Sequence, residues 1–168
     1  DKSINIKGTI ISSGEFLLFL DGDMELLIDY SQLQTCLKFI KKNKIAGVQG
    51  SLEDYLNGKK INVLRVVKEP TSVNYLPGSA FYSRISLEKN NFNPNLNANE
   101  ERELGYRLKK EGYEMKILPL AMVKHKRRSQ IDGFKNISRK YKNNYYLGLG
   151  QVLRSNFRYP SLFLKHLI

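Results

Sequence analysis

The sequence predicts a layered α/β fold, in which helices cover the faces of a β-sheet. Residues 15–21 read EFLLFLD, an unbroken apolar run that ends in an acid and is typical of a buried strand. Residues 29–43 follow with apolar side chains at helical spacing, and residues 45–49 and 62–67 then show short strand patterns. A strand, a helix and further strands in this order predict helices packed on a sheet.

The first strand and helix have the clearest patterns. A run that is apolar at every position, rather than at alternate ones, predicts a strand buried on both faces of a mainly parallel sheet. Lysines gather at the C-terminal end of the helix, where the helix dipole favours cations. The apolar face of the helix consists of Leu33, Cys36, Leu37 and Ile40.

Turn residues divide the middle of the chain. The dipeptide Asn57-Gly58 predicts a turn between the two later strand patterns. Pro77-Gly78 introduces another apolar strand at residues 79–82.

A second helix is expected at residues 100–111, after a polar loop at residues 90–99. Asn99 is its expected N-cap, and three glutamates fill its first turn, where the dipole favours anions. Leu104 and Leu108 form its buried stripe, and the helix ends at a glycine.

The remaining elements are less regular. Residues 114–118 form an expected strand closed by Pro119, and residues 121–125 form a second extended piece. Residues 132–155 have the pattern of a weakly amphipathic helix, with Tyr141, Tyr145, Leu149 and Val152 as its apolar face.

Charge is distributed unevenly along the 168 residues, of which 41% are hydrophobic, enough for one domain with a core. Residues 1–114 carry 16 basic and 15 acidic side chains, whereas residues 115–168 carry 12 basic side chains and one acid, Asp132. The sequence therefore predicts a basic C-terminal extension on a nearly neutral body. Such an extension can attract nucleic acid, anionic lipid or a diphosphate, or it can simply be a solvated surface.

Cysteine content and hydropathy limit the class of protein. The single cysteine, Cys36, excludes an internal disulfide and a multi-cysteine zinc site, and it suggests a reducing compartment. No run of 18 apolar residues occurs. The apolar stretch 159–168 is too short to span a bilayer, and a parent protein that continues toward a membrane is an open expectation.

The acids of Asp21-Gly22-Asp23 stand where the first strand is expected to end. Ligands bind at this edge of an open α/β sheet, and two carboxylates separated by a glycine can face one hard divalent cation. Such a cation could bridge a diphosphate. The alternative is an acidic turn that only terminates the strand.

Two further groups carry candidate chemistry. Glu100 and Glu101 open the second helix, where a carboxylate could act as a general base or merely stabilise the dipole. His125 could complete a metal site, and Arg127 and Arg128 beside it could hold phosphate oxygens. The alternative for this histidine is a surface position without a role.

Four motifs occur in a fixed order: DGD at 21–23, LPGSAFYSR at 76–84, EERELGYRLKKEGY at 100–113 and ILPLAMVKH at 117–125. The combination resembles the inverting family-two glycosyltransferases of the GT-A fold and covers nearly the whole chain to about residue 128. The resemblance implies a mixed sheet flanked by helices.

The resemblance also implies roles for the motif residues. Asp21 and Asp23 would bind Mg²⁺ or Mn²⁺ and the nucleotide diphosphate, with Asp23 as the direct ligand, and His125 would join them. Glu101, or Glu100 beside it, would be the catalytic base. The residues that would line the donor-sugar and acceptor pocket are Pro77, Gly78 and Ser79.

The chain departs from the family pattern in two ways. Glu101 stands where aspartate is usual, which leaves the base open between the two glutamates. The strands that recognise the base and ribose are missing before residue 1, and residues 3–13 resemble the helix that precedes the DxD strand. We therefore expect a catalytic domain at 1–128 with an incomplete nucleotide-binding half, a basic helical extension at 129–168 packed on it, and no sugar transfer by this chain alone.

The implied function is transfer of a sugar, with inversion, from a nucleotide-diphosphate sugar to a saccharide or lipid-linked acceptor in bacterial surface polysaccharide synthesis. One rival is a non-catalytic basic module that binds nucleic acid or an anionic membrane, although nucleic acid leaves the acidic motifs unexplained. Another is an inactive GT-A domain kept for assembly. The expected location is the cytoplasm, either free or peripheral at the inner face of the plasma membrane.

Overall fold

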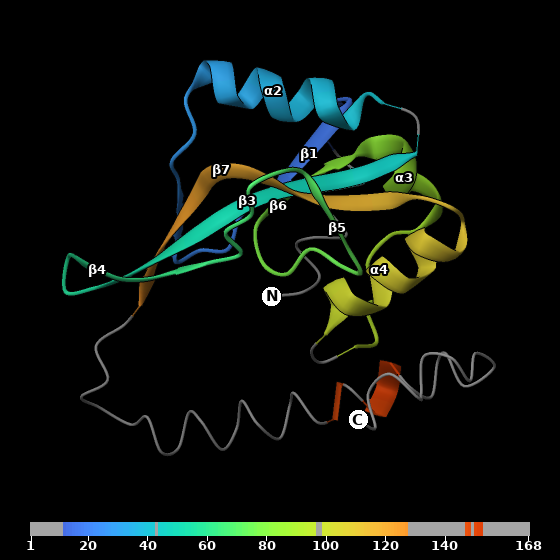
Figure 1. Cartoon of the computed structure of the whole chain (residues 1–168). Coiled ribbons are helices and arrows are strands. Elements are labelled where there is room, and N and C mark those ends of the chain that lie inside the picture. The colour runs from blue at the N-terminus through green and yellow to red at the C-terminus, as the bar shows by residue number, and fades with distance from the viewer. Residues whose placement is uncertain (1–11, 43, 97–98, 128–146, 149, 153–168) are drawn as a thin grey trace.

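The computed structural model describes residues 12–42, 44–96, 99–127, 147–148 and 150–152 (Figure 1). Its elements are β1 (Phe16–Phe19), β2 (Met24–Leu26), α2 (Tyr30–Ile40), β3 (Ile45–Leu56), β4 (Lys59–Leu64), β5 (Thr71–Val73), β6 (Ala80–Ser83), α3 (Arg84–Lys89), α4 (Glu100–Lys110) and β7 (Glu114–Arg127).

The described strands form one mixed sheet. Its main order is β1-β6-β3-β7-β2, with β4 beside β3 and β5 beside β7. Only β3 and β7 pair in parallel, and every other described pairing is antiparallel. Helix α2 covers one face of the sheet, and α3 and α4 lie on the other side (Figure 1).

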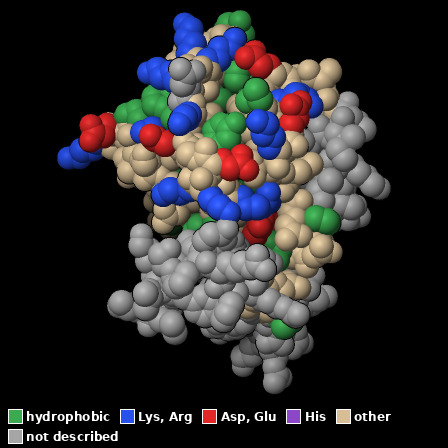
Figure 2. All heavy atoms as spheres, turned by 90° about the vertical axis from the view of Figure 1, so that its right-hand side faces the viewer, with side chains coloured by type: hydrophobic (Ala, Val, Ile, Leu, Met, Phe, Trp, Pro, Cys, Tyr) green, Lys and Arg blue, Asp and Glu red, His purple; other side chains and the backbone are tan. Residues whose placement is uncertain are grey.

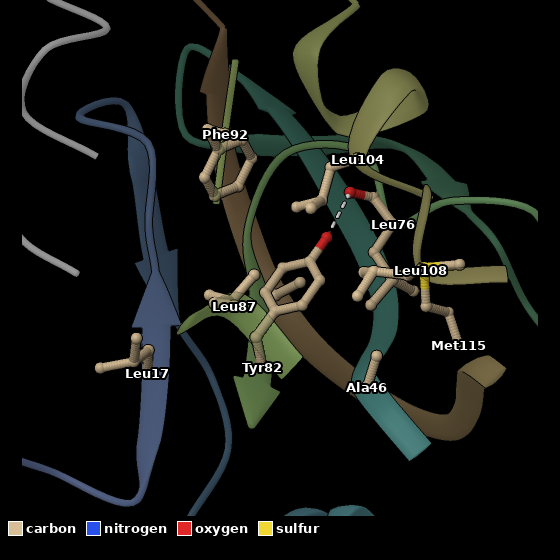
Figure 3. Close-up of a cluster of buried hydrophobic side chains, with 10 residues drawn as sticks. Leu17, Ala46, Leu76, Tyr82, Leu87, Phe92, Leu104, Leu108 and Met115 are labelled. Carbon is tan, nitrogen blue, oxygen red and sulfur yellow. Dashed lines mark hydrogen bonds between the residues drawn. The ribbon is translucent and has the colours of Figure 1, made fainter. Parts of the chain in front are cut away.

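Strand alternation divides the core between these two faces. In β6, Ala80 and Tyr82 pack with the leucines of α3 and α4, whereas Phe81 between them packs with Cys36 and Ile40 of α2. The α3/α4 side is drawn in Figure 3, where the Tyr82 hydroxyl donates to the Leu76 carbonyl at 3.5 Å. Burial of each leucine, isoleucine or phenylalanine side chain in these two groups contributes about 1.5–3 kcal/mol to the stability of the fold.

Helix α2 confirms the first predicted helix. Asp29 precedes it as N-cap, and its carboxylate accepts from the Gln32 backbone N–H at 2.8 Å. The Gln32 side chain in turn accepts from the Asp29 backbone at 3.0 Å, which completes a capping box.

The prediction for the first strand is wrong in direction and burial. Strand β1 pairs antiparallel with β6, and Leu18 and Leu20 are exposed while Leu17 is buried. An apolar run reports hydrophobicity at each position but contains no information about the direction of the neighbouring strand. The parallel pairing lies instead between β3 and β7.

Two of the later strands are longer than expected: β3 continues to Leu56, and β7 joins the two extended pieces predicted at 114–118 and 121–125. Asn57-Gly58 forms the predicted turn, now between β3 and β4, and β5 was not predicted at all. Strand β7 continues through Pro119 because the register with β3 shifts there, between the pairs Gln49–Ile117 and Ser51–Ala121. A proline is tolerated at such an irregularity, where its missing N–H breaks no regular ladder.

Helix α4 begins and ends near the predicted positions, with Leu104 and Leu108 fully buried. Asn99 occupies the N-cap position, but its φ is +62° and its side chain makes no cap hydrogen bond, so the predicted side-chain cap is wrong. Its carbonyl accepts from the Glu103 N–H at 3.0 Å. Gly112, with φ of +82°, follows the helix as predicted.

Acidic and basic side chains are mixed over the face in Figure 2 rather than gathered by sign. Most of the predicted 132–155 helix, including Tyr141 and Tyr145, lies outside the described residues, although residues 147–148 and 150–152 are helical. Within the described residues, no helix combines the length and apolarity needed to cross a membrane.

Candidate functional site

Loops from four parts of the chain meet at a cleft of about 380 Å³ beside the C-terminal end of β1. Its lining residues are Asp21, Met24, Leu52, Asp54, Leu64, Arg65, Tyr75, Pro77, Gly78, Asn99, Glu101, Arg102 and His125. We call this the acidic cleft, because most of the candidate carboxylates line it or contact its lining.

Asp21 follows β1, and its position is fixed from the loop before β6. The Asp21 backbone N–H donates to the Ser79 hydroxyl at 3.1 Å. Partial burial raises the pKa of the Asp21 carboxyl, and the negative charges of Asp23 and Glu100 raise it further, while His125 acts in the opposite direction. A carboxylate in this environment is stabilised by a bound cation.

Asp23, His125 and Asp54 form a row across three elements. His125 on β7 stands beside Asp54 on β3 in the parallel register, and its Nδ1 lies 2.8 Å from Asp54 Oδ1. Its Nε2 lies 3.5 Å from Asp23 Oδ2. Since a carboxylate only accepts, Nδ1–H donates to Asp54, and Nε2 is the ring nitrogen that faces Asp23.

Glu101 projects from the first turn of α4 toward the loop before β6. The Gly78 backbone N–H donates to its carboxylate. Burial raises the pKa of the Glu101 carboxyl, with smaller contributions from Glu100 and Asp21 in the same direction. A raised pKa makes this carboxylate a stronger proton acceptor than an ordinary surface glutamate.

Gly78 is favoured by its backbone conformation, and its Cα lies close to the cleft. Its φ is +70°, a region that side chains with a Cβ rarely adopt. A Cβ at this position would lie 3.3 Å from Met24 Cε and 3.5 Å from Asp21 Oδ2. The close approach of this backbone therefore links the Asp21 and Glu101 sides of the cleft.

Gln49 on β3 holds the loop before β6 through side-chain hydrogen bonds. It is fully buried in β3, and its Nε2 donates to the carbonyls of Pro77, at 2.7 Å, and Ser79. Its Oε1 accepts from Arg65 Nη1 at 3.0 Å, and the same Nη1 donates to the Pro77 carbonyl at 3.1 Å. Residues 77–79 are thus fixed by a buried amide and a guanidinium.

A larger cavity of about 550 Å³ lies elsewhere, at the end of α2 and the start of α3. Its lining includes Lys41, Lys42 and Arg84 but none of the candidate carboxylates at 21, 23, 100 or 101. The convergence of acids and His125 identifies the smaller cleft as the better site.

Comparison with solved structures reveals the same architecture in enzymes of known class. GalNAc-T7, crystallised with UDP, GalNAc and Mn²⁺, matches with a TM-score of 0.64 at 15% identity over 77% of this chain and 30% of its own. Residues 1–349 of S. aureus TarS with UDP-GlcNAc match with a TM-score of 0.53 at 19% identity over 74% of this chain and 38% of that chain.

The chain has a GT-A fold. It spans about a third of the length of these glycosyltransferase chains. Neither a protein-family model nor a curated protein sequence matches it.

Most of the predicted site residues converge within this GT-A fold. Asp21, Pro77, Gly78, Glu101 and His125 line the acidic cleft. Three more lie beside this lining. Asp23 faces His125, the Ser79 hydroxyl accepts from the Asp21 backbone, and the charge of Glu100 raises the pKa of Asp21 and Glu101. Arg127 ends β7, but its side chain and all of Arg128 lie outside the described residues.

The residues suit a divalent cation in part. Within the described ranges, no group of three or more His, Cys, Asp or Glu side chains converges on one metal position. Asp23 and His125 are nonetheless adjacent, and the bond to Asp54 leaves Nε2 able to donate its lone pair. A metal at this point would need further oxygen ligands from a substrate or water.

Sequence reasoning missed Asp54, Gln49 and Arg65. Gln49 is a polar residue within the apolar stretch IAGVQG, a position where a buried amide must find partners, and this was an available signal. Asp54 and Arg65 belong to no motif, and the sequence contains no comparable signal for them.

Proposed function

We propose that this chain is the metal- and acceptor-binding part of a glycosyltransferase that uses a nucleotide-diphosphate sugar. The observation that carries the proposal is the convergence, in one cleft of a GT-A fold, of Asp21, the Asp23–His125 pair and Glu101. The matched structures, GalNAc-T7 with UDP and Mn²⁺ and TarS with UDP-GlcNAc, agree with this use of the fold.

In the proposed reaction, Asp23 and His125 would hold Mg²⁺ or Mn²⁺, with Asp21 beside them. The cation would neutralise charge on the departing diphosphate. Ser79 fixes the Asp21 backbone, and Gly78 lets the 77–79 loop approach the substrate closely.

Glu101 is the proposed base, which takes the proton from the acceptor hydroxyl as that oxygen attacks the anomeric carbon from the opposite face. Its raised pKa and its place on the cleft wall support this choice over Glu100, which does not line the cleft. Glu100 would act by its charge, which raises the pKa of both Asp21 and Glu101.

The biological setting is part of the proposal. We propose inverting, family-two chemistry on a saccharide or lipid-linked acceptor in bacterial surface polysaccharide synthesis. The basic residues of 115–168 would bring the protein to the inner face of the plasma membrane, and Arg127 and Arg128 would hold phosphate oxygens. A module that only binds nucleic acid or anionic membrane would leave the partly buried Asp54–His125 bond and the Gly78–Glu101 contact without a purpose.

Binding of a panel of nucleoside diphosphates and their sugars, with and without Mn²⁺, tests the proposal on this chain by NMR. We expect Mn²⁺-dependent broadening of the signals of Asp21, Gly78 and His125, and sugar transfer in a natural protein that contains this chain together with a nucleotide-binding segment. Absence of metal-dependent binding for every member of the panel would rule the proposal out.

A further inference from the structure

A second cleft of about 430 Å³ adjoins the acidic cleft. The two share Arg65, Tyr75 and Pro77 in their linings. The remaining lining of the second cleft consists of Ser72, Val73, Asn74 and Ile117. A ligand that starts in the second cleft can therefore reach Glu101 past Arg65.

Basic side chains surround this second cleft. Lys116 Nζ donates to the Ser72 hydroxyl at 3.1 Å, and Lys109 Nζ donates to Asn74 Oδ1 at 2.7 Å. Arg102 Nη2 donates to the Tyr75 hydroxyl at 3.0 Å. The acid Glu114 accepts from Ser72 but is itself paired with Lys116 at 2.9 Å.

The lining of the second cleft contains one charged residue, Arg65, and no acid, and we call it the basic cleft. Its wall is firm, because a Cβ on Gly105 of α4 would come within 2.6 Å of Tyr75 Cβ. Helix α4 thus packs directly against residues 74–75, which leaves the cleft a preformed shape.

Arg65 is fixed at the junction of the two clefts. Its Nη1 is bonded to Gln49 and Pro77, and its backbone has a φ of +60°, a strained conformation for arginine. Within the described part of the chain, Nε and Nη2 have no hydrogen-bond partner, and neither atom is fully enclosed. Two N–H directions of a held guanidinium therefore remain available to a ligand.

The charge on Arg65 is only partly compensated. Burial lowers the pKa of the guanidinium, and this effect exceeds the opposing influence of Tyr75, Glu101 and Asp54. Asp54 already accepts from His125, and Glu101 from Gly78. An oxyanion on Nε and Nη2 would restore the interactions that this cation has lost with water.

We propose that the basic cleft is the acceptor subsite, that it takes a saccharide or polyol bearing a phosphate or carboxylate, and that Arg65 binds that oxyanion. This inference rests on the proposed function and specifies the acceptor class. The donor diphosphate is the other possible source of an oxyanion. It fits less well, because neither Asp21 nor His125 of the proposed metal side lines the basic cleft.

The test uses three probes on the 168-residue chain: inorganic phosphate, glucose 6-phosphate and neutral glucose. The readout is the NMR signal of Arg65 Nε–H together with the signals of Ser72 and Asn74. We expect saturable shifts with both phosphates and none with glucose at the same concentrations. This arm needs no variant, so it remains valid if a substitution at Arg65 unsettles the 77–79 loop.

Two variants with the same loss of charge sharpen the test. Arg65→Met should weaken glucose 6-phosphate binding by roughly tenfold or more, the usual loss for a charged hydrogen bond. Lys68→Met removes a charge from the same connection between β4 and β5 but lies outside both clefts, so its affinity should stay within about twofold of the wild type. Arg65→Lys keeps the charge without the fork and should fall between them.

The outcomes separate the inference from the proposed function. Equal phosphate binding by wild type and Arg65→Met, or phosphate shifts confined to residues outside the basic cleft, would overturn the inference. A loss of Mn²⁺-dependent UDP binding in Arg65→Met as large as in Asp23→Ala would reassign Arg65 to the donor and also overturn it. Failure of wild type to bind any nucleoside diphosphate with Mn²⁺ would instead count against the proposed function, whatever the phosphate probes show.

Discussion

His125 donates from Nδ1 to the buried carboxylate of Asp54 over 2.8 Å, and this bond determines which imidazole nitrogen faces Asp23. Asp54 is fully buried, whereas His125 is about one quarter exposed. The histidine therefore has one anchored nitrogen and one nitrogen open to the acidic cleft. Removal of the anchor should change the chemistry of the open nitrogen.

Asp54→Ala should weaken Mn²⁺ binding by about 10- to 100-fold, the usual effect of losing a partner that orients a metal-binding histidine. Asp54→Asn should lose less Mn²⁺ affinity, because an amide oxygen still accepts from the His125 Nδ1–H. Mn²⁺ titration by calorimetry gives the affinities, and ¹⁵N NMR of His125 in metal-free protein gives the tautomer. The matched control is Glu53→Ala, which removes the neighbouring acid that pairs with Lys60. Equal Mn²⁺ affinities in the two alanine variants would contradict the role of Asp54.

Asp23→Ala should lose at least about tenfold in Mn²⁺ affinity, because it removes the carboxylate that faces His125 Nε2. Glu25→Ala serves as the comparison, since Glu25 is two residues away but pairs with Lys124 and Lys126 instead. Calorimetric titration with Mn²⁺, alone and with UDP, measures both. Similar binding by the two variants would remove Asp23 from the metal site.

Glu101→Gln should lower turnover by about 10²- to 10⁴-fold in a protein competent for transfer, because glutamine keeps the shape but cannot accept the proton. Donor binding should change little, so the loss should fall on kcat. Glu100→Gln should lower turnover by a smaller factor. Steady-state kinetics with the donor found in the binding panel measures both, and full activity in Glu101→Gln would exclude Glu101 as the base.

The same substitution should stabilise the fold at neutral pH. Because the folded state raises the pKa of Glu101, it binds a proton more readily than the unfolded chain, so stability falls as pH rises through the interval between the two pKa values. Glu101→Gln should therefore raise Tm at pH 7, at roughly 2–4 °C for each 1 kcal/mol gained. The gain should shrink below the unfolded pKa of about 4.3.

Thermal melts of wild type and variant between pH 3 and pH 8 test this linkage. Asp21→Asn should show the same pH-dependent gain in Tm, since the pKa of Asp21 is also raised. A pH-independent difference between wild type and Glu101→Gln would show that packing, rather than the buried charge, causes the effect.

Gly78→Ala and Gly58→Ala form a pair that separates backbone strain from function. Both glycines have positive φ, +70° and +76°, so each substitution should cost roughly 1–3 kcal/mol of stability. A Cβ on Gly58 meets nothing within 4 Å, whereas one on Gly78 lies against Met24 and the Asp21 carboxylate. Only Gly78→Ala should therefore also impair nucleotide binding. Denaturant unfolding and UDP titration measure the two effects, and equal UDP affinity in both variants would contradict the assignment.

Periodicity and turn residues were sufficient to predict helices α2 and α4 and the β3–β4 turn, whereas the short helix α3 was not predicted. Helix α2, for example, has an apolar face and a capping aspartate within one short stretch. Strand direction could not be predicted. Strand β1 and its partner β6 are separated by more than sixty residues, and neither segment contains a signal for parallel or antiparallel pairing. The side-chain cap expected from Asn99 failed for a related reason, since its backbone conformation is set by the loop and not by the helix that follows.

The site was predictable where a motif placed two acids close together, as at Asp21 and Asp23. Residues that act through a partner far away in the sequence were not predictable. Asp54 and His125 are 71 positions apart, and only the parallel pairing of β3 with β7 brings them side by side. Arg65 likewise gains its significance from Gln49 and Pro77, which no local pattern connects to it.

The anchoring of residues 77–79 by Gln49 has a consequence for how such a protein can diversify. The metal side and the base side of the acidic cleft both depend on these three residues, whereas the wall of the basic cleft comes mainly from the connection that precedes them. Exchange of residues 66–74 for a segment of other length and chemistry would leave the Gln49 and Ser79 hydrogen bonds intact. Acceptor preference could then be altered by grafting a single contiguous segment that includes the short edge strand β5, while the reacting centre is inherited unchanged.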